Sequence, residues 1–84
     1  MEIEEILTSK GRIKILKLLT MERELNISEI MKQTGLSYAS VNRHLEELKR
    51  GNIIIEKKFG RIRIFRINDK SVIVKALEEF LMKV

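Results

Sequence analysis

The sequence predicts one small α+β domain made of helices and a single β-hairpin. Apolar residues recur at helical spacing in several segments, whereas residues 53–67 alternate with a period of two around a glycine, which is typical of a hairpin. The chain has 84 residues, of which 44% are apolar and 35% are charged. This length suits one hydrophobic core and is too short for two, so we expect a single domain over residues 1–84.

The first predicted helix covers residues 11–21. Its isoleucines and leucines occupy more than half of a helical wheel, so it should be packed on most sides. Thr8 or Ser9 is expected to cap its N-terminus. The amphipathic residues 3–7 precede it, and they either continue this helix or are separated from it by a kink at Gly11.

A short helix, a tight turn and a longer helix are predicted next. After a polar break over residues 22–26, Ser28 is expected to cap a helix over residues 29–34, which Gly35 ends. Ser37 then has the position of an N-cap for a helix over residues 37–50. The apolar side of that helix carries Val41, Leu45 and Leu48, and the opposite side carries Ala39, Arg43 and Arg50.

The hairpin of residues 53–67 is expected to turn at Phe59 and Gly60. The predicted cross-strand pairs are Lys58 with Arg61, Glu56 with Arg63 and Ile55 with Ile64. This register puts Ile53, Ile55, Ile62 and Ile64 on one face and Ile54, Phe65 and Ile67 on the other. Because both faces carry apolar side chains, one of them needs a cover beyond the core of a two-layer domain.

A C-terminal helix is predicted within residues 69–84, with Asn68 or Asp69 as its cap. Apolar residues recur in it at helical spacing, at Ile73, Ala76, Leu77, Phe80, Leu81 and Val84. A core of this size is small, whereas the stripe runs over more than three turns. We therefore expect part of this stripe to pack against a second copy of the chain.

The positive charge is concentrated in the middle of the chain. The net charge is +5, and residues 31–67 hold nine Lys and Arg against three Glu, which gives +6 there. Residues 1–30 and 68–84 carry −1 and 0. A basic region on a balanced scaffold is the electrostatic pattern expected of a protein that binds nucleic acid.

Composition excludes several classes of protein. The chain has no cysteine, which removes disulfides, thiolate metal sites and cysteine nucleophiles. Its one histidine, His44, follows Ser40 by one helical turn, but no third catalytic group can be named, so we predict neither an enzyme nor a metal or cofactor site. No apolar run exceeds three residues and the N-terminus is acidic, which predicts a cytoplasmic protein without a membrane span. Abundant Ile, Glu and Lys without proline is typical of a thermophile, such as a thermophilic archaeon.

The order of these elements resembles the winged helix-turn-helix domain, in particular the small ArsR-like and MarR-like transcription regulators. The resemblance covers residues 9–67 and is carried by Ile13-Lys14-Ile15-Leu16-Lys17-Leu18-Leu19, Ile27-Ser28-Glu29-Ile30, Thr34-Gly35-Leu36-Ser37, Ser40-Val41-Asn42-Arg43-His44-Leu45-Glu46-Glu47-Leu48, Gly60-Arg61 and Phe65-Arg66-Ile67. It implies a sequence-specific regulator of transcription that binds double-stranded DNA. Residues 37–50 would be the recognition helix in the major groove, and residues 53–67 a wing on the flanking backbone or minor groove.

The residues expected to bind DNA are Ser37, Tyr38, Ala39, Ser40, Asn42, Arg43, Lys57, Lys58, Arg61 and Arg63. A helix that enters the major groove needs an outer side with small or polar side chains and hydrogen-bond donors, which the start of the third helix offers. Arg43 is the first choice for reading a base, because its guanidinium can bind guanine through two hydrogen bonds, and Asn42 is the second, with adenine. The wing cations are expected to set affinity more than sequence preference.

The resemblance also implies a homodimer joined through its terminal helices, with Ile73, Leu77, Phe80, Leu81 and Val84 at the seam. The isoleucine face of the hairpin is the alternative seam. Two other functions are open at this point, a winged-helix module that binds proteins and a non-specific binder of chromosomal DNA or RNA. Metal sensing of the ArsR type does not carry over, because the chain lacks thiolates. The operator sequence and any small-molecule effector are not predicted.

Overall fold

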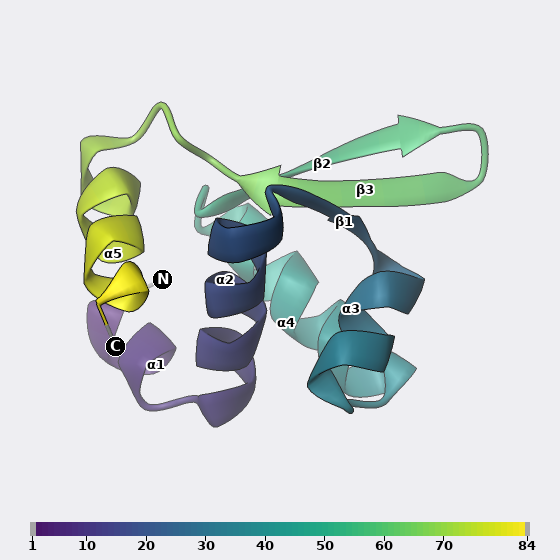
Figure 1. Cartoon of the computed structure of the whole chain (residues 1–84), viewed down its shortest axis with the longest axis horizontal. Coiled ribbons are helices and arrows are strands. Elements are labelled where there is room, and N and C mark those ends of the chain that lie inside the picture. Colours follow the sequence, from purple (N-terminus) through teal and green to yellow (C-terminus); the bar gives the residue numbers. More distant parts are fainter. Residues whose placement is uncertain (1, 84) are drawn as a thin grey trace.

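The computed structural model describes residues 2–83. Within these residues the chain forms five helices and three strands. In chain order they are α1 (Ile3–Leu7), α2 (Lys10–Glu22), β1 (Glu24–Asn26), α3 (Ile27–Thr34), α4 (Tyr38–Arg50), β2 (Ile54–Phe59), β3 (Ile62–Ile67) and α5 (Val72–Met82). Helix α2 lies in the middle, with α1 and α5 on one side of it and α3 and α4 on the other (Figure 1). The hairpin of β2 and β3 extends away from α5 (Figure 1).

The first two helices are separate. Ser9 caps α2, its Oγ accepting a hydrogen bond of 3.2 Å from the Arg12 amide, so the break falls at residues 8–9 and not at Gly11. Gly11 lies in the first turn of α2, where a Cβ would be 2.6 Å from Nε2 of His44 on α4. This position therefore needs a glycine because of the close approach of α4, not because the chain bends there.

Local hydrogen bonds fix the ends of α3 and α4. Asn26, not Ser28, caps α3, because Asn26 and Glu29 exchange side chain to backbone hydrogen bonds of 2.8 and 2.9 Å. Gly35 ends α3 with φ of 75°, a left-handed conformation that glycine adopts without strain. Ser37 caps α4 as predicted, at 3.2 Å from the Ser40 amide.

The last helix begins later than predicted. Ser71 caps α5, its Oγ accepting a hydrogen bond of 3.3 Å from the Val74 amide. Asn68 has another role, since its amide donates to the Ile53 carbonyl and its side chain to the Asn52 carbonyl, both at 2.9 Å. These two bonds close the open end of the hairpin, so Asn68 was not available as the cap.

The sheet has three antiparallel strands in the order β1-β3-β2. The sequence did not predict β1, which was interpreted as a polar break, but Leu25 in it is buried opposite Phe65. The hairpin turns at Gly60 and Arg61, so Lys58 pairs with Arg63 and Glu56 with Phe65. The predicted register was wrong by two residues, because Gly60, with φ of 61°, takes the first position of the turn and not the second.

A register error of two residues leaves every side chain on its predicted face, since sheet faces alternate with a period of two. The face with Ile54, Phe65 and Ile67 is buried against the helices, and Ile55, Ile62 and Ile64 lie on the other face. Ile53 is an exception. It precedes β2 and is buried in the core, so the predicted four-isoleucine face has three isoleucines.

Helix α5 divides its apolar residues between the core and the surface. The predicted dimer seam was Ile73, Leu77, Phe80, Leu81 and Val84. Leu77 and Leu81 are only 8% and 4% exposed and pack with Val74 into the core, so their assignment to the seam was wrong. Ile73 and Phe80 are 76% and 52% exposed, and Val84 lies outside the described residues.

Among residues 2–83, the helices are all too short or too polar to cross a bilayer.

Candidate nucleic-acid interface

Helix α4 is anchored along one side and free along the other. Its side chains Val41, Leu45 and Leu48 are fully buried, which fixes the orientation of the helix. Tyr38, Ala39 and Arg43 are exposed on the other side, with Ser37 exposed at the cap. Ser40 and Asn42 are half-buried. The first turn and a half of α4 therefore presents polar or small side chains and unpaired backbone amides to the outside, as a groove-entering helix requires.

Arg43 and Asn42, the two candidates for reading bases, differ in how they are held. The Arg43 side chain is 68% exposed, and its only ion pair among the described residues is a long one, 4.0 Å from Nε to Glu47. Asn42 Oδ1 instead accepts a hydrogen bond of 2.8 Å from Arg63 on β3. Arg43 is thus free to reach a base, whereas Asn42 is engaged with the hairpin.

Asn42 is part of a polar cluster that joins α4 to the hairpin. We call it the helix–wing clamp, and its members are Asn42, Glu46 and Lys49 of α4 with Glu56 and Arg63 of the hairpin. Glu56 is at its centre, accepting hydrogen bonds of 2.6 Å from Lys49 Nζ and 2.8 Å from Arg63 Nε. Glu46 pairs with the same two cations, at 3.0 and 3.7 Å.

The clamp holds its charges tightly. The Glu56 side chain is only 6% exposed, and the hydrogen bond from Arg63 is the main cause that lowers its pKa to about 2, with Lys49 acting in the same direction. Glu56 in turn raises the pKa of both Lys49 and Arg63. These three side chains are therefore all charged at neutral pH, and they fix the angle between α4 and the hairpin.

The clamp corrects one sequence-based assignment. Arg63 was expected to face DNA, but its guanidinium pairs with Glu56 and Glu46 within the protein. Lys49, at the C-terminal end of α4, is bound to the same two carboxylates. The sequence carried a signal for this cluster. Alternation places Glu56 on the same face of the hairpin as the buried Phe65, where a carboxylate needs cationic partners.

The hairpin tip keeps two of the four predicted wing cations free. Lys58 and Arg61 are exposed and form no ion pair within residues 2–83. Lys57 lies on the opposite face of the sheet from Lys58 and pairs with Glu24 at 3.6 Å. Lys58 shares the face of the helix–wing clamp, so it is on the same side of the hairpin as α4.

His44 is buried between α2 and α4. Burial is the main cause that lowers its pKa, and the nearby Arg12 and Arg43 lower it further, so the ring is neutral at pH 7. Its Nδ1 atom has no hydrogen-bond partner among the described residues. Beside it, Arg12 of α2 donates a hydrogen bond of 2.7 Å to Glu47 of α4. His44 and the Arg12–Glu47 pair thus hold α4 against the central helix.

A family description that reads "Bacterial regulatory protein, arsR family" matches residues 9–56. This match covers more than half of the chain, from the cap of α2 to the first half of β2. The chain belongs to the ArsR family. The predicted family, the winged helix-turn-helix fold and the role of a DNA-binding transcription regulator are confirmed.

Three solved structures superpose on nearly the whole chain. HlyU from Vibrio cholerae is 25% identical, with a TM-score of 0.83 over 96% of this chain and 85% of that one. The transcriptional repressor PagR of Bacillus anthracis is 23% identical, with a TM-score of 0.77 over 93% and 86%. A homodimeric DNA-binding domain from Mycobacterium bovis is 24% identical, with a TM-score of 0.76 over 94% and 70%. A comparison with curated protein sequences gives no significant match.

Residues 2–83 contain no group of three or more His, Asp and Glu side chains placed to hold a metal ion. His44, the single histidine, has no carboxylate hydrogen-bonded to its ring there and packs against Gly11 instead. In this ArsR-family chain the helix-turn-helix of α3 and α4 and the adjacent hairpin are the parts suited to bind DNA.

Proposed function

We propose that the chain binds specific double-stranded DNA with the start of α4 in the major groove and the hairpin tip on the flanking backbone. The observation that carries this proposal is the separation of its cations into two sets. Lys49 and Arg63 are used within the helix–wing clamp, whereas Arg43, Lys58 and Arg61 are exposed and available to bases and phosphates. The start of α4 adds small or polar side chains to this surface, at Ser37, Tyr38, Ala39 and Ser40. Asn42 and Arg63 hold the hairpin against α4 and do not contact DNA themselves. Lys57, on the opposite face of the sheet from Lys58, contributes least to DNA binding.

Changing Arg43 to alanine is expected to relax sequence preference, because a bidentate contact with guanine is worth about 1–3 kcal/mol of discrimination. Lys58→Ala should weaken binding to all duplexes alike and make the slope of log affinity against log salt shallower, by about 0.9 per lost phosphate contact. Selection of bound fragments from a random duplex pool, followed by salt titration of the selected site, measures both effects. Lys70→Ala, which changes an exposed lysine outside α4 and the hairpin, is the control.

Binding curves of both variants that coincide with the parent's would contradict the groove assignment. A parent chain that enriches no duplex, or that binds all duplexes equally, would favour the two alternative functions, a protein-binding module or a non-specific binder of nucleic acid.

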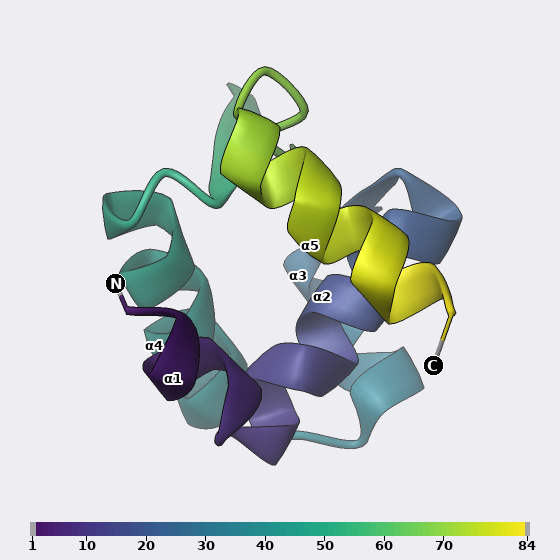
Figure 2. The ribbon, with the colours of Figure 1, turned by 90° about the vertical axis from the view of Figure 1, so that its left-hand side faces the viewer.

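We infer a two-fold homodimer formed by α1 and α5. The two helices lie at the same side of the molecule (Figure 2), where Ile3, Leu7, Ile73 and Phe80 are large apolar side chains left exposed. Ile3 and Ile73 line one shallow hollow, which makes this surface continuous between the helices. The structural neighbour from Mycobacterium bovis is homodimeric, which supports the same assembly here. A dimer would present its two α4 helices to half-sites about 34 Å apart.

Phe80→Asp is expected to give a folded monomer, since it places a charge at the proposed seam while leaving the core intact. Sedimentation velocity measures the mass, and circular dichroism confirms the fold. Met21→Asp is the matched control, because Met21 is an exposed apolar residue outside α1 and α5. A parent chain that sediments as a monomer, or a Phe80→Asp variant that stays dimeric, would contradict this seam.

A further inference from the structure

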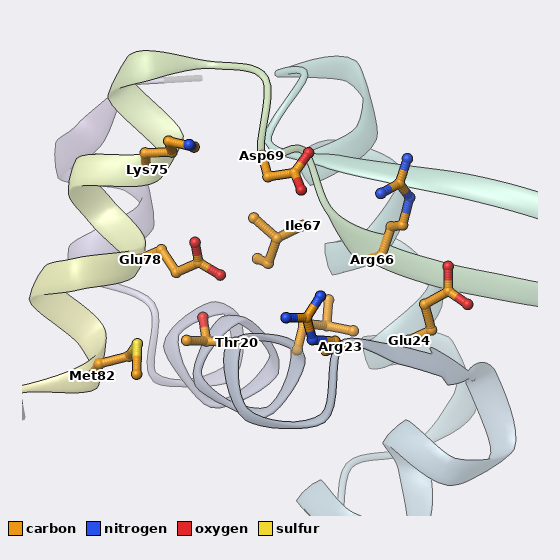
Figure 3. A pocket seen from close by; sticks show the side chains of 10 residues that line it. Thr20, Arg23, Glu24, Arg66, Ile67, Asp69, Lys75, Glu78 and Met82 are labelled. Carbon is orange, nitrogen blue, oxygen red and sulfur yellow. The ribbon is translucent and has the colours of Figure 1, made fainter.

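A groove with a volume of about 460 Å³ lies between α5, the end of α2 and the strands β1 and β3 (Figure 3). It is separate from the exposed face of α4 and from the proposed dimer seam, because none of the residues assigned to either lines it. Its apolar part includes Leu19 and Ile67, both buried. A volume of this size is within the range of small-molecule sites, about 300–1,000 Å³.

Charges of both signs line the groove, and most of them are unpaired. Arg23, Arg66 and Lys75 supply three positive charges, and Glu24, Asp69 and Glu78 supply three negative ones. Within residues 2–83, Glu24 alone among these six forms an ion pair, with Lys57. Because the groove presents charges of both signs that do not pair with each other, it offers contacts to a ligand that carries both charges.

Arg66 gives an independent indication of a missing partner. Its Nε atom is buried and has no hydrogen-bond partner among the described residues. A buried donor without an acceptor costs about 1–3 kcal/mol, so such groups are normally satisfied by protein, water or ligand. A carboxylate is the acceptor that suits an arginine best.

The arrangement of charges sets the class of ligand. Arg23 lies at the end of α2 and Arg66 on β3, whereas Glu78 projects from α5 and Asp69 from the loop before it (Figure 3). The three carboxylates make the groove unsuitable for a nucleic-acid backbone, which they would repel. We propose that the groove binds a small zwitterion of the amino-acid or short-peptide class. Its carboxylate would contact Arg23 and Arg66, its ammonium group Asp69 and Glu78, and its apolar part Met82 and the edge of Ile67.

A ligand in this groove would contact both the strand that carries the wing and the helix that carries the proposed dimer seam. Arg66 and Ile67 belong to β3, which carries the wing, and Glu78 belongs to α5, which carries the proposed seam. Binding would therefore bias the placement of the wing relative to the dimer axis, and through it the affinity for DNA. This consequence rests on the proposed function, whereas binding in the groove does not.

The test is a thermal-shift assay of the full chain without DNA, with each of the twenty free L-amino acids and the dipeptide Leu-Leu, followed by calorimetric titration of the strongest. We expect at least one zwitterion to raise the Tm, because a ligand that binds the folded state stabilises it. The N-acetylated and the amidated forms of that ligand, each lacking one charge, should bind about tenfold more weakly or worse, since each loses a charge-assisted hydrogen bond.

Two variants locate the site. Arg66→Met and Glu78→Gln should each weaken binding about tenfold, with far-ultraviolet circular dichroism showing that they fold, and Lys32→Gln on the exposed part of α3 should bind as the parent does. The proposal is overturned if none of the probes raises the Tm, if the capped forms bind as well as the free ligand, or if both groove variants bind it unchanged. Failure of the chain to bind DNA would contradict the proposed function but not this proposal, because the thermal shift and the calorimetric titration are both measured without DNA.

Discussion

Replacing Leu77 by aspartate is expected to unfold the chain and not to separate a folded dimer. Leu77 is 8% exposed and packs between Val74 and Leu81 in the core. The change removes apolar burial and places an unpaired carboxylate there, which together cost about 4 kcal/mol or more. Native proteins have a total stability of about 5–15 kcal/mol, and a domain of this size lies at the low end of that range, so this loss takes most of it. Loss of the far-ultraviolet circular dichroism signal of the parent at 25 °C is the measurement.

Phe80→Asp, three residues along the same helix, is the matched comparison for this prediction. Phe80 is 52% exposed, so the same new charge remains in contact with water and the monomer should stay folded. A Leu77→Asp variant that melts like the parent and sediments as a monomer would place Leu77 at the seam after all. The pair of variants thus separates the part of α5 that belongs to the core from the part offered to a second copy.

The division of α5 shows what a sequence pattern leaves open. Its apolar residues, from Val72 to Met82, form an arc wider than one face of a helix. The pattern predicts a helix and its core-facing side only approximately, because the packing of α2 against it selects Val74, Leu77 and Leu81 from that arc. The same limit explains the hairpin, where alternation predicted the two faces correctly while the turn residues decided the register.

Several predictions based on local chemistry are confirmed, although the caps of α3 and α5 were assigned to the wrong residues. Ser37, Gly35 and the exposed side of α4 follow from capping, a left-handed turn and helical periodicity, and all three are confirmed. Strand β1 was missed because three residues carry almost no periodic signal and their partner is about 40 residues away. The predicted contact between Glu56 and Arg63 is formed as an ion pair of 2.8 Å. The α4 part of the clamp was missed, since Glu56 meets Lys49 only once the hairpin is folded over α4.

Replacing Glu56 by glutamine is expected to lower the free energy of unfolding by about 1–3 kcal/mol at pH 7. The neutral amide keeps the shape of the side chain but leaves Lys49 and Arg63 without their central anion. Glu46, which contacts both cations at 3.0 and 3.7 Å, replaces only part of it. Urea unfolding followed by circular dichroism measures the loss, and Glu79→Gln, an exposed glutamate on α5, is the control.

The pH dependence of this loss identifies the charge as its cause. The pKa of Glu56 is about 2 in the folded chain against an ordinary value of 4.5, so between these values the unfolded chain binds more protons. The contribution of Glu56 is therefore complete above about pH 4.5 and disappears as the pH falls toward 2. Glu47, whose pKa is lowered chiefly by its hydrogen bond from Arg12, titrates in the parent and in the variant alike, so their difference reports Glu56.

We therefore expect the stability gap between the parent and Glu56→Gln to be widest near neutral pH and to close in acid. The variant should also bind DNA more weakly at pH 7, because Arg63 holds Asn42 and sets the wing against α4 through the same carboxylate. A gap that stays constant from pH 7 to pH 3 would show that Glu56 acts through packing alone. In that case the wing would not be positioned by charge, and Lys49→Met should affect neither stability nor DNA affinity.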